Sequence, residues 1–180
     1  MGYWNTRGLR GSAFEDLINM TNDVYKQRNV AIIQKIPTPI TPVKLDKEHG
    51  QITLAYFDKQ STVDYIGAVQ GIAVCFDAKE TREKRLPMQN IHEHQMDFME
   101  HFERQDGVSF LLVHFAVLDE YYYLPFPVLK KYWDEAQRGG RKSVPYTAFE
   151  QKYRLYPSDG YPLNYLEGIN TYLADKENSD

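Results

Sequence analysis

Cysteine is almost absent from this chain, since Cys75 is the only one among 180 residues. A single cysteine excludes an internal disulfide, and it leaves no Cys-based zinc site, because such sites need several thiolates. This usage is typical of proteins in a reducing compartment, so we expect a cytoplasmic location.

Long apolar runs are absent as well. No stretch reaches the 18 or so apolar residues that indicate a membrane-spanning helix. Residues 1–10 are polar and glycine-rich, unlike a signal peptide, so we expect neither membrane insertion nor secretion. A length of 180 residues, with 42% hydrophobic and 26% charged, predicts one globular domain over residues 1–180.

The chain also lacks an excess of positive charge. The net charge is −4 and the pI about 5.7, which does not favour a nucleic-acid binder. Part of the acidity lies in a short predicted tail, residues 175–180. Basic residues gather in two stretches, namely Lys79, Arg82, Lys84 and Arg85, and then Lys130, Lys131, Arg138, Arg141 and Lys142. Such patches permit DNA binding but do not argue for it.

The first third of the chain predicts a helix, a strand and an arm. Ser12 and Glu15 have the spacing of a capping box, and the helix that they open should end near residues 28–29. Residues 30–36 form an apolar run typical of a strand. Three prolines within the next six residues exclude a helix, and residues 51–57 are strand-like again. We therefore expect residues 37–57 to form a projecting, hairpin-like arm.

The remainder predicts a mixed α/β fold without repeats. Two strand-length runs around Gln70-Gly71 indicate a β-hairpin. After it we expect a long helix with Ile91, Met96 and Met99 directed inward, two strands of which the first is central, and two helices. The predicted elements are the strands 63–69 and 72–78, the helix 88–104, the strands 108–118 and 121–126, and the helices 128–137 and 165–173.

The predicted hairpin carries the candidate catalytic and metal-binding residues. Side chains two apart on a strand share a face, so Thr62 lies with Asp64, and Asp77 lies with Lys79. Pairing the strands would bring two carboxylates and an ammonium group to one patch. Two close carboxylates repel each other unless a proton or cation intervenes, and oxygen ligands suit Mg²⁺. Such an ion could bridge a scissile phosphate and activate water, with Lys79 stabilising the developing charge.

This spacing alone is a weak signal, because many solvated hairpins carry it by chance. The surrounding order is more informative. A helix with an acid, a hairpin with this motif and then a long helix resembles the layout of a nuclease of the PD-(D/E)xK type. The residues by themselves leave its substrate open.

Two blocks of the chain, Ala78-Lys79-Glu80-Thr81 and His92-Glu93-His94-Gln95, are together highly specific. With them stand, in order, the stretches 14–16, 19–22, 35–39, 55–57, 59–62, 64–67, 76–81, 86–95, 140–143 and 161–162. In these stretches, and over roughly residues 6–174, the chain closely resembles the RecU family of Holliday junction resolvases.

The resemblance implies a fold and a reaction. The fold is α/β, a restriction-endonuclease-like core whose central mixed sheet is flanked by helices, with residues 37–57 as a protruding stalk that enters the open centre of a four-way junction. The protein would be a homodimer that nicks two opposing strands symmetrically. It would use Mg²⁺, for which Mn²⁺ should substitute, and leave 5′-phosphate ends.

The resemblance also implies a site. The metal ligands would be Thr62, Asp64, Asp77 and Gln95, while Lys79 would stabilise the transition state. Glu15 falls where related resolvases place a helical acid that faces the site, although its place in a capping box is already a sufficient structural reason for it. Expected DNA contacts are Arg7, Arg10, Lys35, Arg82, Lys84, Arg85, Arg141 and Lys142.

Two features depart from the family. Position 77 is Asp where the family has Glu, which shortens the reach to the metal by one methylene. Only Arg7 and Arg10 precede the first helix, where the family has a long basic segment. A zinc site at His92 and His94 is not expected, because residues at i and i+2 of a helix point to different faces.

Two other functions are left open by the sequence. One is an accessory protein that binds junctions without cutting them, and the other is a restriction-type endonuclease that cuts linear duplex DNA. Recombinase and branch-migration machinery are further candidate partners of a junction resolvase.

Overall fold

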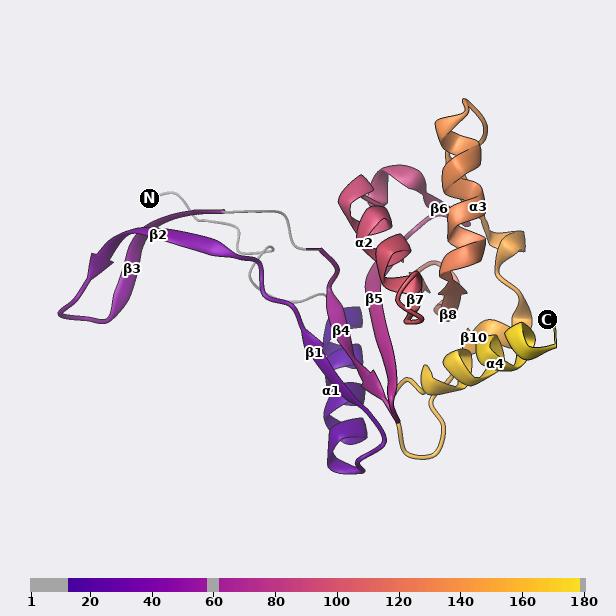
Figure 1. Cartoon of the computed structure of the whole chain (residues 1–180), viewed down its shortest axis with the longest axis horizontal. Coiled ribbons are helices and arrows are strands. Elements are labelled where there is room, and N and C mark those ends of the chain that lie inside the picture. Colours follow the sequence, from indigo (N-terminus) through magenta and orange to yellow (C-terminus); the bar gives the residue numbers. More distant parts are fainter. Residues whose placement is uncertain (1–12, 58–61, 179–180) are drawn as a thin grey trace.

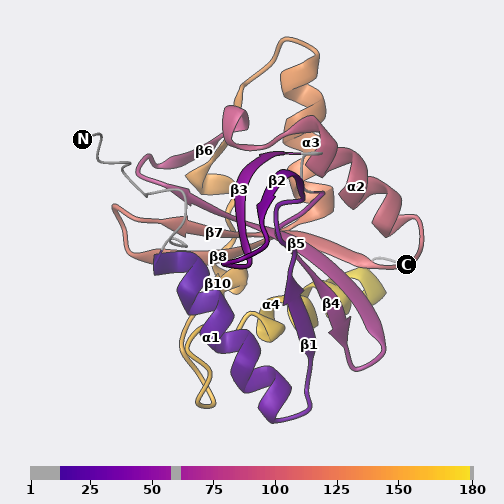
Figure 2. The ribbon, with the colours of Figure 1, turned by 90° about the vertical axis from the view of Figure 1, so that its left-hand side faces the viewer.

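The computed structural model describes residues 13–57 and 62–178, and a six-stranded sheet forms its centre. The strand order is β1-β4-β5-β7-β8-β10. The strands are β1 (Ile32–Lys35), β4 (Tyr65–Val69), β5 (Ile72–Thr81), β7 (Val108–Phe115), β8 (Glu120–Pro125) and β10 (Arg154–Leu155). The α-helices are α1 (Ala13–Gln27), α2 (Glu93–Glu103), α3 (Phe126–Gln137) and α4 (Leu166–Glu177). Figure 2 shows α1 and α4 on one side of the sheet and α2 and α3 on the other.

The sheet is mixed because β5 and β7 run parallel, while the other neighbouring strands are antiparallel. A parallel pair needs a crossover connection, which here contains α2. Of the eight residues of β7, only His114 is not buried, as expected for a strand covered on both faces. The predicted central position of this apolar strand is confirmed.

The two faces of the sheet have different cores. On the α1 and α4 face, four aromatic rings from neighbouring strands stack in a row, Tyr65 on Phe76, Phe76 on Phe110 and Phe110 on Tyr123, with centroids 4.4–4.7 Å apart. Because side chains alternate along β5, Cys75 and Asp77 face α2 and α3 instead. The aromatic row thus fixes which face of β5 carries polar residues.

The predicted hairpin is confirmed around Gln70 and Gly71, whose positive φ values of 48° and 94° are those of a tight hairpin turn. The first strand is shorter than predicted, because β4 begins only at Tyr65. Thr62 and Asp64 therefore precede the strand, and the argument that strand alternation places them on one face was wrong.

The arm predicted from the prolines is a two-stranded antiparallel sheet of β2 (Ile40–Asp46) and β3 (Gln51–Phe57). Figure 1 shows it extending away from the six-stranded sheet. Its pairing is irregular after Pro42, as expected because proline has no N–H to donate to the ladder.

The predicted helix 88–104 was wrong at its start. Residues Met88–Asn90 form a short 3-10 helix, η1, and Ile91 and His92 are extended before α2 begins at Glu93. The break lies at these two extended residues, where the Ile91 side chain is buried in the core, and the Met88 N–H before them donates to the Lys142 carbonyl. As a result His92 and His94 do not point to different faces, since their rings lie 5.4 Å apart and nearly parallel. Ile91, Met96 and Met99 are buried as predicted.

Several short elements were not predicted. Strand β6 (Arg85–Pro87) pairs with β9 (Ser143–Pro145), and two further 3-10 turns, η2 (Tyr146–Ala148) and η3 (Gln151–Tyr153), precede β10. The predicted acidic tail begins inside α4, where Asp175 contacts Lys152 and Tyr153. Ser12 of the predicted capping box lies outside the described residues. No helix in the described part is long and apolar enough to cross a membrane.

Gly67 of β4 allows the edge strand β1 to approach closely. A Cβ atom added there would lie 2.1 Å from the Ile32 carbonyl oxygen and 2.8 Å from the Ile33 Cα. We expect Gly67→Ala to lower the free energy of unfolding by about 1–3 kcal/mol, the usual cost of overpacking. Urea denaturation measures this. Ile32→Ala, at an exposed position of the same strand pair, is the control and should change stability by less than about 0.5 kcal/mol. A Gly67→Ala protein as stable as the wild type would contradict the close approach.

Candidate metal centre

Two hydrogen bonds tie the side chains of Asp64 and Asp77 to the backbone of the neighbouring segment. The Asp64 N–H donates to Asp77 Oδ1 at 2.6 Å, and the Ala78 N–H donates to Asp64 Oδ2 at 3.2 Å. The Asp64 carbonyl accepts a third bond, of 2.8 Å, from the Ile36 N–H. Side chains thus replace the backbone ladder where β4 and β5 separate, and this exchange brings the two carboxylates together.

Lys79 joins them from the same face of β5. Its Nζ lies 3.0 Å from Asp77 Oδ2 and 3.3 Å from the Gln95 amide oxygen. That amide oxygen also accepts the His92 N–H at 3.1 Å, so Gln95 caps the start of α2 while it contacts the lysine. Asp77 is fully buried, and Gln95 is 7% exposed.

The electrostatics of this cluster oppose full ionisation. Burial raises the pKa of Asp64 to about 6, and the neighbouring Asp77 carboxylate adds to that rise. The Lys79 ammonium and the Ala78 N–H act in the opposite direction, while the charge of Glu15 raises the pKa further. One lysine thus does not fully offset the two acids, and an additional cation would be stabilising here.

The donor atoms fit a divalent cation with a partly hydrated shell. Asp77 Oδ2 is buried and accepts no hydrogen bond within the described part of the chain, its one close partner being the Lys79 ammonium. Among the residues that the structure describes, no group of three or more His, Cys, Asp or Glu side chains is placed to hold a metal ion. Mg²⁺ commonly uses one or two carboxylates and keeps several waters, so the two aspartates suit it. The Gln95 amide oxygen, which accepts from Lys79 and His92, would exchange one of these donors for the ion.

Two other predicted site residues lie at the margin. Glu15, in the first turn of α1, acts on the pKa of Asp64 and forms an ion pair of 2.5 Å with Lys35 of β1. The predicted DNA contact Lys35 is therefore already paired with an acid. Thr62 is exposed two residues before Asp64. The structure thus brings Asp64, Asp77, Lys79 and Gln95 together, with Glu15 nearby.

Five of the predicted basic residues lie next to the short strands β6 and β9, whose pairing the sequence did not reveal. Arg82 and Lys84 are exposed in the turn after β5, Arg85 is exposed in β6, and Arg141 and Lys142 are exposed just before β9. The antiparallel pairing of β6 with β9 joins the two stretches. Strands of three residues have too little periodicity to be predicted. Arg7 and Arg10 lie outside the described residues.

Comparison with known proteins gives a consistent result. The profile of the family described as Recombination protein U matches residues 9–171. A protein of Oenococcus oeni named Holliday junction resolvase RecU is 43% identical over 167 residues, which span 90% of this chain and 85% of that protein. Proteins of the same name from Limosilactobacillus reuteri and Leuconostoc citreum are 41% and 40% identical, over 93% and 94% of this chain and 84% of each of them.

One solved structure is also similar, the Hjc protein of Archaeoglobus fulgidus, a Holliday junction resolvase. It matches 63% of this chain and 75% of its own with a TM-score of 0.36 and 8% identity, a likeness too small to support the fold.

The raised pKa of Asp64 makes stability depend on pH. The carboxyl group ionises near its ordinary value of 3.8 when unfolded but near 6 when folded, so the fold loses stability as the pH rises through this window. Asp64→Asn cannot ionise and keeps an acceptor for Ala78. We expect it to be more stable than the wild type at about pH 8 with a chelator present, with the difference vanishing towards about pH 4. Thermal denaturation across this range measures the effect.

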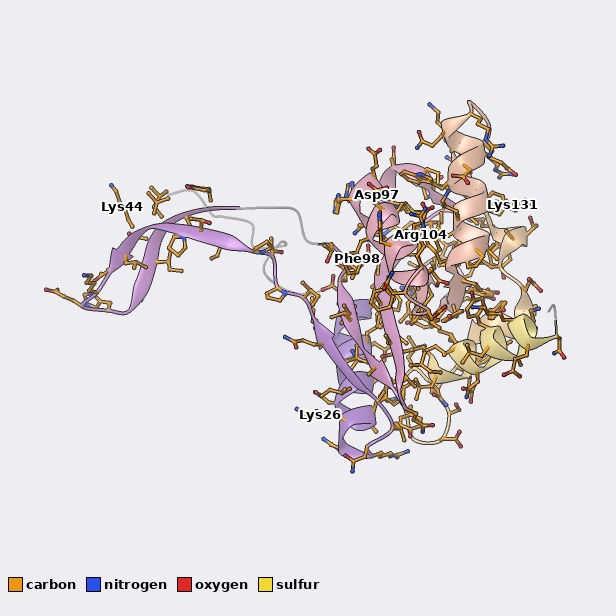
Figure 3. All side chains as sticks on the ribbon, in the orientation of Figure 1. Lys26, Lys44, Asp97, Phe98, Arg104 and Lys131 are labelled. Atoms are coloured by element: carbon orange, nitrogen blue, oxygen red, sulfur yellow. The ribbon has the colours of Figure 1, made fainter. Side chains whose placement is uncertain are left out.

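The matched control is Asp97→Asn, an exposed aspartate on α2 that Figure 3 labels. Its thermal stability should equal that of the wild type at every pH. If the thermal stability of Asp64→Asn also equals that of the wild type at every pH, the raised pKa of Asp64 is contradicted.

Proposed function

Because the chain belongs to the RecU family of Holliday junction resolvases, we propose that it is an endodeoxyribonuclease that resolves four-way DNA junctions with a divalent metal ion. The observation that carries the proposal is the meeting of Asp64, Asp77 and Lys79 on one face, where the two strands of a hairpin separate. Two acids and an ammonium group at such a position are suited to phosphodiester hydrolysis.

The metal would be held by the two aspartates, with Gln95 and Thr62 as neutral oxygen ligands. Mg²⁺ is the ion that this oxygen set favours, and Mn²⁺ should substitute. When bound, the ion would lower the pKa of a coordinated water and offset charge on the phosphate. Asp77 replaces the family's Glu and is one methylene shorter. Its fixation by the Asp64 N–H supports a ligand that is already oriented.

Lys79 would act on the phosphate directly. An ammonium group held between Asp77 Oδ2 and the Gln95 amide oxygen is oriented before substrate arrives, which is the condition for stabilising charge that develops in a transition state. Gln95 links this lysine to the first turn of α2 through the His92 N–H. Glu15 would add a negative charge to the centre from α1, as its effect on the pKa of Asp64 indicates.

Resolution of a junction needs two cuts, and a single site reaches one strand. We therefore propose a homodimer in which a twofold axis relates two sites and makes the nicks symmetric, with 5′-phosphate products. The hairpin of β2 and β3 would be the family's stalk, which enters the open centre of the junction. The mixed sheet with its parallel pair β5 and β7 supports a restriction-endonuclease-like core.

The first test uses synthetic four-way junctions. The wild type should make paired nicks that require Mg²⁺ or Mn²⁺. Asp77→Asn should abolish both nicks yet keep junction binding, because the amide retains the shape of the side chain. Lys79→Leu should lower the cleavage rate on the order of 10²–10³-fold, the usual loss for one stabilising donor. Asp97→Asn is again the control.

The rival functions give different outcomes. If the wild type leaves junctions intact with every divalent metal, and the Asp64→Ala variant binds junctions as tightly as the wild type does, the chain is an accessory protein. Equal cutting of linear duplex and junction would indicate a restriction-type endonuclease. Either result contradicts the proposal, as would a strictly monomeric active species.

Gln95 allows the ligand role to be separated from the positioning of Lys79. Gln95→Leu removes the acceptor from both Lys79 and His92, and we expect activity to fall about 10–100-fold, as for other residues that orient a metal site. Gln95→Glu keeps an oxygen in place and should retain more activity than the leucine variant.

Mn²⁺ affinity, measured by calorimetry on the same variants, identifies the cause. Weaker binding by Gln95→Leu would support Gln95 as a ligand. Unchanged affinity with a lower rate would contradict the ligand role and leave Gln95 as a positioning residue for Lys79.

A further inference from the structure

A groove of about 720 Å³ lies between the unpredicted β6–η1 segment and the second half of α3. These elements are neighbours in Figure 1, where β6 and α3 both lie towards the top. The apolar part of its lining includes Pro87, Met88 and Trp133, and its cations are Arg85 and Lys142. The groove thus combines an aromatic surface with positive charge, although the whole chain is acidic at −4.

Two cations, Arg85 and Lys142, and one acid, Glu83, line the groove, and both cations come from stretches rich in basic residues. Residues 82–85 contain three cations and one acid, and residues 138–142 contain three cations and no acid. The acid, Glu83, pairs with Arg85 at 2.5 Å, but both side chains are about half exposed, so a competing phosphate can break that pair at little cost. The pairing of β6 with β9 brings one cation from each stretch, Arg85 and Lys142, to the lining of the groove. An anionic ligand is the complement of such a surface.

A continuous row of residues joins the groove to the metal centre. Asp77, Lys79 and Thr81 share one face of β5, with about 7 Å between successive members. The Thr81 hydroxyl donates to the Arg85 carbonyl at 3.1 Å, which holds the start of β6 against the end of β5. Arg85 also lines the groove, so the groove lies beyond Thr81, the last member of this row.

We propose that this groove binds unpaired nucleotides of the DNA strand next to the phosphodiester bond that is cut, with a base against Trp133 and phosphates against Arg85 and Lys142. This proposal rests on the proposed function, which supplies the position of that bond. The apolar lining favours an unpaired strand over a duplex. In a duplex the bases are paired and stacked, whereas an unpaired base presents a ring face that stacks on an aromatic side chain.

Trp133 is suited to be such a surface because its position is fixed. It is partly buried and packs against the core between the sheet and the helices α2 and α3, while it also lines the groove. A base that stacks on it would meet a ring already held by the fold, so little conformational entropy would be lost on the protein side.

The sequence makes Trp133 directly observable. The chain has two tryptophans, Trp4 and Trp133, so the full-length Trp4→Phe variant leaves Trp133 as the sole indole. We would titrate this variant with a short oligothymidylate, and separately with a duplex of the same length, in the presence of a chelator that prevents cleavage. The single strand should quench the Trp133 fluorescence to saturation, and the duplex should leave it almost unchanged.

Substitutions then test each contact. Trp133→Leu should weaken binding of the single strand about tenfold, the scale of one lost base–aromatic stack, whereas Trp133→Phe should retain most of it. Arg85→Gln and Lys142→Gln should each reduce the slope of log affinity against log salt by about 0.7, the loss of one phosphate contact on a single strand. Lys26→Gln, at an exposed cation of α1 remote from β6 and α3 in Figure 3, should change neither quantity.

Other results would overturn the proposal. Equal quenching by single strand and duplex, or wild-type affinity of Trp133→Leu for the single strand, would exclude a site for unpaired nucleotides. Quenching by an acidic peptide but not by DNA would make the groove a protein-binding site.

A separate junction-cleavage assay distinguishes this failure from failure of the proposed function. If junctions are cleaved but the single strand does not change the Trp133 fluorescence, the groove proposal alone is overturned. Quenching by the single strand without any cleavage overturns the nuclease function alone.

Discussion

The carboxylate of Asp77 is the constraint on which the site depends, because it is fully buried. A buried charge without partners is strongly destabilising. Its partners here are the Asp64 N–H and the Lys79 ammonium. To supply that N–H, the chain before Tyr65 must leave the regular ladder with β5. This separation of β4 from β5 has two effects. It frees an N–H that stabilises the buried Asp77 carboxylate, and it brings Asp64 beside Asp77.

The rest of the fold keeps this arrangement in register. The aromatic row of Tyr65, Phe76, Phe110 and Tyr123 occupies the opposite face, so a slip of β5 by one residue would bury Asp77 among these rings and turn Phe76 towards α2 and α3. The parallel pairing of β5 with β7 then requires a crossover, and α2 within it carries Gln95 to Lys79. Hydrophobic packing on one face therefore positions the chemistry on the other.

The same crossover connects the metal centre to the basic surface. It leaves β5 at Thr81, passes through β6 and η1 beside the groove, and returns at His92 to cap α2 against Gln95. One segment of chain thus contributes to the cationic groove and to the orientation of the lysine.

Local chemistry was enough to predict much of this protein. The positive φ required after Val69 made Gln70-Gly71 a turn, the prolines after Ile36 excluded helix, and alternation along β5 put Asp77 and Lys79 on one face. Each of these depends on neighbours within a few residues. The resemblance to RecU added Gln95, whose part in the site no local pattern indicates.

Long-range contacts decided what the local pattern could not. The helix predicted from residue 88 is interrupted at Ile91 and His92, which are extended and bury Ile91 in the core. The segment before them pairs with β9, and Met88 donates a hydrogen bond to Lys142, more than fifty residues later in the chain. Asp64 leaves its strand because a buried carboxylate takes its N–H, and Glu15 is bound to Lys35 of another element. Burial and distant hydrogen-bond partners arise only when the chain is folded, so a periodicity read along the sequence contains no trace of them.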